Sequence, residues 1–334
     1  MVPVHTDDYV IDPPSDGTGT PGGRTLPEVF ASAVASAPDA VALVDGDRSW
    51  TWAEWRADVD ALARGLQESH VAPGDVVAVR LPNSWELQTL HLAVAAVGAV
   101  LLPLHQGTAV GEVRALLDRA EPVLLVLSGA EGEGPATARA LLDGVPSLRG
   151  VLLAGGPAAG GAEPGIGSLD GLLAAWAGSG PRPVEVTPDL PFVLVPSSGT
   201  ASPRPKLCLH SHDGLLSNTA AVTAEAADAF AGTVLTACPM THLFGLQAVH
   251  AALSTACRQV VLTDWDADRF LALAREHDPR VVFAVPTQLW DVVGRLESSE
   301  GSAGFAPTRC GRRAPRSRPR SPGGCGRRSP ANWS

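Results

Sequence analysis

The sequence predicts an α/β fold in which parallel β-sheets carry α-helices on both faces. Two patterns predict it. Short apolar segments alternate along the chain with longer segments in which apolar residues recur at helical spacing. The short segments, such as 75–81 and 100–104, are apolar nearly throughout, as expected of strands buried on both faces. This βαβα alternation is typical of parallel sheets covered by helices.

The first half of the chain keeps this alternation regularly. Thr51 and Glu54 form a capping box before a helix with Trp52 and Trp55 on one face, and Ser84 is placed to cap the next helix. The expected helices are Leu26–Ala37, the helix after Thr51, Trp85–Val97, Gly111–Ala120 and Ala136–Leu142. The expected strands are Val41–Val44, Asp75–Leu81, Val100–Leu104, Pro122–Leu127 and Gly150–Leu153.

In the second half, the pattern resumes after a loop rich in Gly, Ala and Pro at 154–167 and a short helix near 169–176. An apolar strand, 192–196, leads into a polar loop, and a further strand begins at Lys206. The remaining expected elements are helices Asp213–Phe230, Leu246–Ser254, Asp266–His277 and Pro286–Leu296, and strands Lys206–His210, Thr233–Ala237, Val260–Leu262 and Val281–Ala284.

Composition divides the chain into three parts. Residues 1–24 are polar and rich in Gly and Pro, and we expect them to be disordered. Residues 25–298 form the folded domain. Residues 299–334 form a tail rich in Arg, Pro and Gly without periodicity, also expected to be disordered. A basic nucleic-acid-binding arm is one interpretation of the tail. A frameshift in a GC-rich gene fits better, because the tail has many arginines and no lysine.

Charge and hydropathy exclude several classes of function. The formal net charge is −10, and the first 307 residues alone carry −18, which disfavours a nucleic-acid or anionic-membrane partner. The longest apolar run, Leu92–Leu104, is too short to cross a bilayer, and the N-terminus lacks a signal pattern. We therefore expect a cytoplasmic protein.

Metal binding is not expected either. Cys208, His210 and His212 are spaced to share one face of a strand, but no fourth ligand is evident and the cysteines lack CxxC spacing.

The strongest local signal is the loop Ser197–Lys206. Its hydroxyl and glycine residues suit an anion-binding nest of backbone N–H groups, and a lysine side chain offsets phosphate charge. Lys206 is the only lysine beside 24 arginines, which suggests that a compact ammonium group is needed there. An ordinary polar hairpin loop is the alternative for the Ser/Gly/Thr cluster alone.

Several segments together resemble the adenylate-forming superfamily, which comprises acyl- and aryl-CoA synthetases, luciferases and the adenylation domains of peptide synthetases. Its phosphate loop, Ser-Gly-Thr-Thr-Gly-x-Pro-Lys-Gly, is similar to Ser198-Gly199-Thr200 and Pro205-Lys206 here. The other matching segments, in order, are Trp52–Trp55, Gly98–Leu104, His210–His212, Pro239–Gly245 and Val285–Thr287.

The resemblance implies the large N-terminal AMP-binding domain of that fold over residues 25–298, in incomplete form, and a defined chemistry. In the family, ATP activates a carboxylic acid as an acyl-adenylate, and a thiol such as coenzyme A or a carrier protein then takes the acyl group. ATP, Mg²⁺ and coenzyme A are the implied cofactors, and an apolar carboxylic acid is the implied substrate. Lys206 and His242 are the implied catalytic residues, with His242 beside the carboxylate pocket. The implied ATP-phosphate ligands are Ser197, Ser198, Gly199, Thr200 and Lys206.

The sequence departs from the family pattern at two places. Ala201-Ser202 stands where Thr-Gly is expected, and the loop is one residue longer, with Pro203 and Pro205 removing N–H donors. The family's Tyr-Gly-x-Thr-Glu segment, its ribose-binding Asp and its small C-terminal domain have no counterpart in the readable sequence. We therefore expect impaired activity, with a catalytically silent nucleotide-binding module as the alternative.

Overall fold

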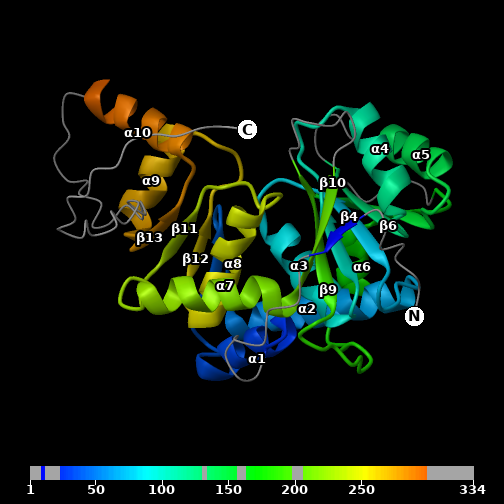
Figure 1. Ribbon diagram of the computed structural model, residues 1–334, viewed down its shortest axis with the longest axis horizontal. Helices are drawn as coiled ribbons and strands as arrows, with labels where there is room; N and C mark the ends of the chain where they lie inside the picture. The colour runs from blue at the N-terminus through cyan, green and yellow to red at the C-terminus, as the bar shows by residue number, and fades with distance from the viewer. Residues whose placement is uncertain (1–8, 12–22, 130–133, 156–162, 198–205, 299–334) are drawn as a thin grey trace, which may run out of the picture. The chain divides into compact units, whose positions relative to one another are not determined.

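The computed structural model describes residues 9–11, 23–129, 134–155, 163–197 and 206–298. These residues form two β-sheets with α-helices between them and on their outer faces (Figure 1). The α/β class predicted from the sequence is confirmed. The described strands pair in parallel, except that β9–β10 in one sheet and β2–β3 in the other are antiparallel.

The larger sheet contains the strand before the predicted phosphate loop and the strand after it. In spatial order its described strands are β1 (Tyr9–Ile11), β10 (Lys206–Ser211), β9 (Pro191–Ser197), β5 (Val100–Pro103), β4 (Val76–Arg80), β6 (Leu124–Ser128), β7 (Gly150–Ala154) and β8 (Ile166–Ser168). In β4, Val77 and Val79 face one apolar cluster while Val76 and Ala78 face another. Both faces are therefore covered, as the uninterrupted apolar sequence predicts.

The smaller sheet lies on the other side of the central helices. Its described strands, in spatial order, are β13 (Val281–Phe283), β11 (Val234–Thr236), β12 (Gln259–Val261), β2 (Val41–Asp45) and β3 (Arg48–Thr51).

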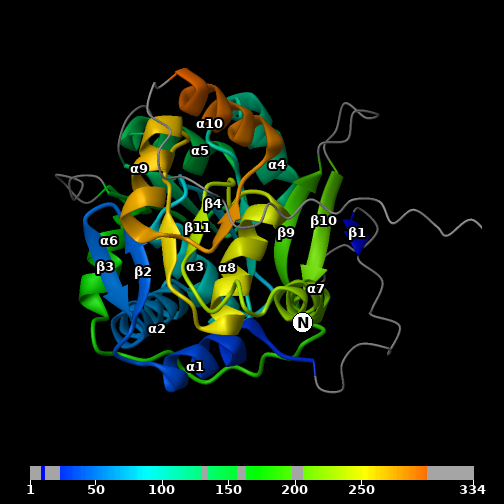
Figure 2. The same ribbon diagram turned by 90° about the vertical axis from the view of Figure 1, so that its left-hand side faces the viewer.

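The helices form a central layer and two outer layers (Figures 1 and 2). The central helices are α1 (Leu26–Ser36), α2 (Trp52–Glu68), α3 (Trp85–Ala96), α6 (Leu169–Ala175), α7 (His212–Glu225) and α8 (Leu243–Thr255). The outer helices are α4 (Val110–Ala120) and α5 (Pro135–Gly144) on the larger sheet, and α9 (Ala267–His277) and α10 (Pro286–Ser298) beside the smaller one. None of the helices in the described ranges combines the length and apolarity needed to cross a bilayer.

Local signals placed the helix starts well. Thr51 and Glu54 form the expected capping box, in which the Glu54 carboxylate accepts from the Thr51 N–H at 2.8 Å. The Ser84 hydroxyl caps α3 by accepting from the Leu87 N–H. Side-chain oxygens that bind the first free N–H groups fix where a helix begins, and this effect is encoded locally.

The structure differs from the sequence prediction mainly where strands pair with segments far away in the chain. The segment 1–24 was expected to be disordered, but Tyr9–Ile11 forms β1, parallel to Leu207–Leu209 (Figure 2). Ile166–Ser168 forms edge strand β8 partly within an expected loop. His212 does not share a strand face with Cys208 and His210, because the chain turns at a bulge and Ser211 caps α7. The tail 299–334 lies outside the described residues.

A stack of buried aromatic rings joins the central helices to strand β9. The Nε2 atoms of His91 and His250 lie 2.8 Å apart, so one imidazole donates and the other accepts. Both rings contact Phe192, whose other neighbour is His212 at a centroid distance of 4.1 Å. His212 Nδ1 accepts from the Leu26 N–H at 3.1 Å.

The stack requires neutral imidazoles. Burial, together with a smaller effect of the neighbouring His212, lowers the pKa of His250 to about 3. Burial also lowers the pKa of His212 to about 4, although Glu28 opposes this shift. For His91, burial is again the main cause, and His250 and His212 add to the lowering of its pKa. In the unfolded chain these rings protonate near pH 6.5.

Acidification is therefore expected to destabilise the fold before most carboxylates titrate. Below pH 6.5 the unfolded state binds more protons than the folded state, so the free energy of unfolding decreases as the pH is lowered. Each of His212 and His250 should cost about 2 kcal/mol between pH 7 and pH 5. Denaturant unfolding at both pH values measures this. His250→Gln should reduce the pH dependence by about one histidine's share, and an unfolding free energy independent of pH would contradict the prediction.

Candidate nucleotide and carboxylate site

The predicted phosphate loop connects β9 and β10 at one edge of the larger sheet. Ser197 ends β9 and its Cα pairs with that of Lys206, the first residue of β10. β9 runs parallel to β5, with Val193 opposite Leu101, so the loop starts at the carboxyl ends of the parallel strands. Ligands of open α/β sheets bind at this edge.

The residues expected to hold the phosphates are only partly described. Ser198, Gly199 and Thr200 lie outside the described residues, as do the side chains of Ser197 and Lys206. Their role as ATP-phosphate ligands therefore stays a prediction.

His242 comes to the same region from the smaller sheet. It follows β11 and is the N-cap residue of α8, with an exposed side chain. The helix starts three residues earlier than expected, because His242 O already accepts from the Leu246 N–H. Partial loss of water around the ring lowers the pKa of His242, and the nearby His105 imidazole lowers it further.

His105, which follows a strand of the larger sheet, lies close to His242 of the smaller sheet. His105 was not identified as a site residue from the sequence. The His105 ring lies 6.2 Å from the His242 ring, centroid to centroid. His105 is four residues after Leu101, and Ser197 is four residues after Val193, its partner in β9. His105 is thus on the same edge as the start of the phosphate loop. Its place two residues after a parallel strand was the available signal.

Asn83 holds the segment before His242 in place. Its Nδ2 donates to Cys238 O at 2.8 Å and to Leu262 O at 3.4 Å, and its Oδ1 accepts from the Met240 N–H at 2.8 Å. The side chain is buried, so its amide satisfies backbone groups that water does not reach. One amide thereby fixes the ends of two strands of the smaller sheet against the start of α3.

Gln288 makes a second connection of this kind. Its Nε2 donates to Ala237 O at 2.9 Å, and its Oε1 accepts from the Val285 N–H at 2.9 Å. The Val285–Thr287 segment, noted in the sequence for its family resemblance, is therefore attached directly to the chain that leads to His242.

Gly245 allows the sharp turn that presents His242. A Cβ at this position would lie 2.1 Å from Pro239 O and 2.8 Å from the Met240 Cα. Both are backbone atoms, which cannot move away independently. The Pro239–Gly245 segment therefore requires glycine at its end for steric reasons.

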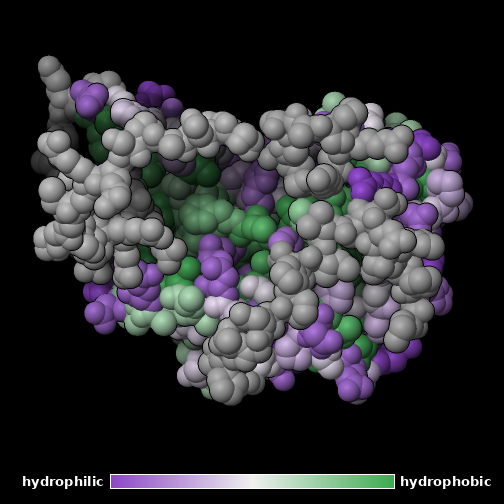
Figure 3. Space-filling view, viewed as in Figure 1, coloured by the Kyte–Doolittle hydropathy of each residue, from purple (hydrophilic) through white to green (hydrophobic). Residues whose placement is uncertain are grey.

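A hydrophobic hollow lies over the two elements that precede and follow His242 in the chain. Figure 3, in the view of Figure 1, shows apolar residues gathered in a hollow over α8 and β11. Phe244, two residues after His242, is 46% exposed, and its ring is 5.3 Å from that of Phe283. The edge thus combines exposed imidazoles with an apolar surface.

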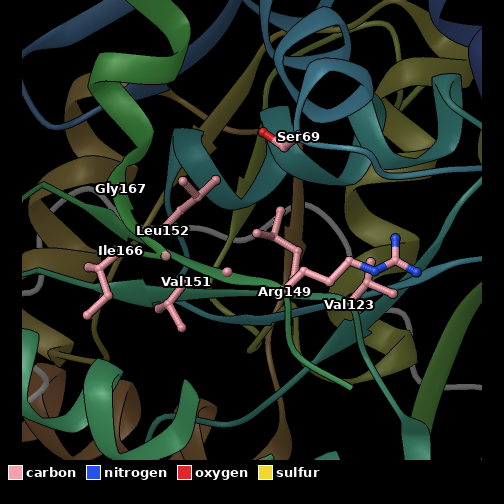
Figure 4. A pocket seen from close by; sticks show the side chains of 10 residues that line it. Ser69, Val123, Arg149, Val151, Leu152, Ile166 and Gly167 are labelled. Carbon is pink, nitrogen blue, oxygen red and sulfur yellow. The ribbon is translucent and has the colours of Figure 1, made fainter. Parts of the chain in front are cut away.

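A separate cavity of about 330 Å³ lies away from this edge (Figure 4). It is lined by residues at the amino ends of β6, β7 and β8, including Leu124, Gly150 and Ile166. The guanidinium of Arg149, which also lines it, already contacts the carboxylate of Asp75 and donates to His70 O. Ligand sites of parallel sheets lie at the carboxyl ends, so we assign no role to this cavity.

Within the described residues, no group of three His, Cys, Asp or Glu side chains is arranged to hold a metal ion.

Comparison with known proteins identifies the family of the chain. A profile of the AMP-binding enzyme family matches residues 30–310. The chain belongs to the AMP-binding enzyme family. The resemblance to adenylate-forming enzymes that the motifs indicated is confirmed.

Individual relatives of the chain differ in length. Protein Y of Streptomyces griseus is 58% identical over 288 residues, which cover 86% of this chain and 92% of that protein. The 3-[(3aS,4S,7aS)-7a-methyl-1,5-dioxo-octahydro-1H-inden-4-yl]propanoyl:CoA ligase of Mycobacterium tuberculosis (strain ATCC 25618 / H37Rv) is 29% identical over 294 residues, 85% of this chain and 56% of that ligase.

Among solved structures, apo MbtA of Mycobacterium smegmatis superposes with a TM-score of 0.72 at 26% identity. The match covers 82% of this chain and 50% of MbtA. The chain thus spans nearly all of protein Y, but only about half the length of the CoA ligase and of MbtA.

The steric requirement at Gly245 gives a testable prediction. Gly245→Ala should destabilise the protein by about 1–3 kcal/mol, because the new methyl group overlaps the Pro239 backbone. Gly294→Ala is the matched control, since nothing lies within 4 Å of a Cβ there. In helix α10 that change should stabilise by about 0.5–1 kcal/mol. Denaturant unfolding of both variants measures the difference, and equal effects would contradict the steric argument.

Proposed function

We propose that the chain binds ATP and an apolar carboxylic acid and joins them as an acyl-adenylate with release of pyrophosphate. One observation carries the proposal. His105 and the start of the phosphate loop follow the carboxyl ends of paired parallel strands, and the His105 ring lies 6.2 Å from that of His242, which comes from the smaller sheet. Membership of the AMP-binding enzyme family supports the same chemistry.

In this proposal the Ser197–Lys206 loop binds the triphosphate. Backbone N–H groups and hydroxyls of Ser197, Ser198, Gly199 and Thr200 donate to the phosphate oxygens, and the Lys206 ammonium offsets their charge. Mg²⁺ bound with ATP would offset part of the phosphate charge. Neutralising charge and aligning the reactants supply most of the rate enhancement in phosphoryl chemistry.

The acid occupies the hollow beside His242. Its apolar part packs near Phe244, which is exposed two residues after His242, and its carboxylate faces the phosphate loop. A carboxylate oxygen attacks the α-phosphorus, the new O–P bond forms, and the bond to the pyrophosphate oxygen breaks. Pyrophosphate leaves with that electron pair, and the acyl-adenylate keeps the AMP.

A thiol then takes the acyl group from the adenylate, releasing AMP. Coenzyme A and a carrier-protein thiol are both candidates for this chain. The name of the Mycobacterium tuberculosis relative specifies a CoA ligase, which favours coenzyme A.

The Lys206 role predicts a specific loss of ATP binding. Lys206→Ala should weaken ATP binding about tenfold or more, because an interaction with a charged group contributes roughly 1.5–3 kcal/mol. Calorimetric titration with ATP measures this. Arg114→Ala is the control, since Arg114 pairs with Asp118 on outer helix α4. An unchanged dissociation constant for Lys206→Ala would refute the phosphate role.

Acid-dependent ATP–pyrophosphate exchange tests the complete proposal. We expect exchange with apolar acids such as octanoate or benzoate and none with glycine, because the hollow beside His242 is apolar. The same assay tests the impaired turnover expected from the sequence. ATP binding without exchange for any acid would instead support the nucleotide-binding module.

A further inference from the structure

We propose that His105 is a substrate-binding residue, which together with His242 brackets the carboxylate of the acid. The inference rests on the proposed function and assigns a second carboxylate-binding side chain to that site. It also explains how two sheets combine to place one substrate group.

The separation of the two rings suits a carboxylate. Their centroids are 6.2 Å apart and the planes are tilted by 36°. Ring nitrogens lie about 1 Å from the centroid, and an N–H···O bond spans about 2.9 Å. The rings are too close for an oxygen to lie on the line between them, but an oxygen beside the pair can reach one nitrogen of each ring. Both side chains are exposed, so a ligand can reach them.

The hydrogen bonding of His105 fixes which nitrogen donates. Its Nδ1 accepts from the Gly107 N–H at 3.0 Å, so the neutral ring carries its proton on Nε2. That Nε2–H is the donor offered to a ligand. Because Nδ1 is already occupied as an acceptor, His105 suits an anion better than a metal ion, which needs a free lone pair.

The loop that carries His105 is held rigidly. The buried Arg80 guanidinium donates to Gln106 O and, at 2.8 Å, to Thr108 O. These two carbonyls flank the Gly107 N–H that orients the ring. The donor is therefore oriented before substrate binds, which reduces the entropy cost of recognition.

The surroundings favour the acid over the nucleotide as the source of the anion. Exposed Phe244 lies two residues from His242 on α8, which borders the apolar hollow, whereas the predicted phosphate ligands are in the loop after β9. Carboxylate and phosphate oxygens offer the same hydrogen-bonding chemistry, so binding of each ligand has to be measured alone.

The experiment combines ring NMR with exchange kinetics on the full chain. Protein labelled with ¹⁵N-histidine is titrated with octanoate or benzoate alone, and separately with ATP alone. We expect the His105 and His242 ring resonances to shift with the acid alone. His105→Asn should raise the KM for the acid on the order of tenfold, since a hydrogen bond to a charged group is lost or lengthened, and leave the KM for ATP unchanged.

His70→Asn is the matched control. His70 is exposed and has a φ of +62°, a conformation that asparagine tolerates, and it lies far along the chain from the site. This variant should alter neither KM nor the His105 resonances.

The outcomes separate this inference from the proposed function. Normal exchange with an unchanged acid KM in His105→Asn would overturn the inference and leave the proposed function standing. Ring shifts with ATP alone would assign the pair to phosphate and also overturn it. If the wild-type chain shows no exchange, the proposed function fails, and the titration decides the inference: shifts with acid alone support it, and no shift with either ligand overturns it.

Discussion

Both β-sheets bury their inner faces in one shared apolar core. Leu43 and Val261 of the smaller sheet belong to the same cluster as Val77 and Leu101 of the larger sheet, with the central helices between them. Because apolar burial is the main favourable contribution to folding, this shared core holds the sheets in a defined relation. The carboxyl ends of their parallel strands are consequently brought close together, and the candidate site depends on that proximity.

Buried polar contacts fix the relative positions of the elements more narrowly than the apolar core does. Asn83 bonds three backbone groups near the ends of β11 and β12, and the His91–His250 pair joins α3 to α8. Each buried polar group needs its partner, since a lost hydrogen bond leaves a desolvated atom. Such contacts permit few alternative packings and thereby fix the position of His242. Strand β9, which leads to the phosphate loop, is held by the same contacts, because its Phe192 packs against His91 and His250.

The candidate site was only partly visible in the sequence. The loop before Lys206 and the segment around His242 have distinctive residue types, so local chemistry indicated them. No distinctive residues surround His105 in the sequence. Its place in the candidate site follows from the register of β5 with β9 and from the proximity of its ring to that of His242. The roles of Asn83 and Gly245 were hidden for the same reason, since their partners lie on other elements or on the backbone of a turn.

By itself the sequence determined the α/β class and most helix starts, and it indicated the segments that we propose carry the chemistry. Periodicity, capping residues and glycine-rich turns act over a few neighbouring residues, and that range is readable in one dimension. Only the tertiary structure decided that Tyr9–Ile11 joins a sheet, that His212 begins a helix instead of extending a strand, and that His105 meets His242. These outcomes depend on strand pairing and side-chain packing between distant segments, whose free energies no local pattern encodes.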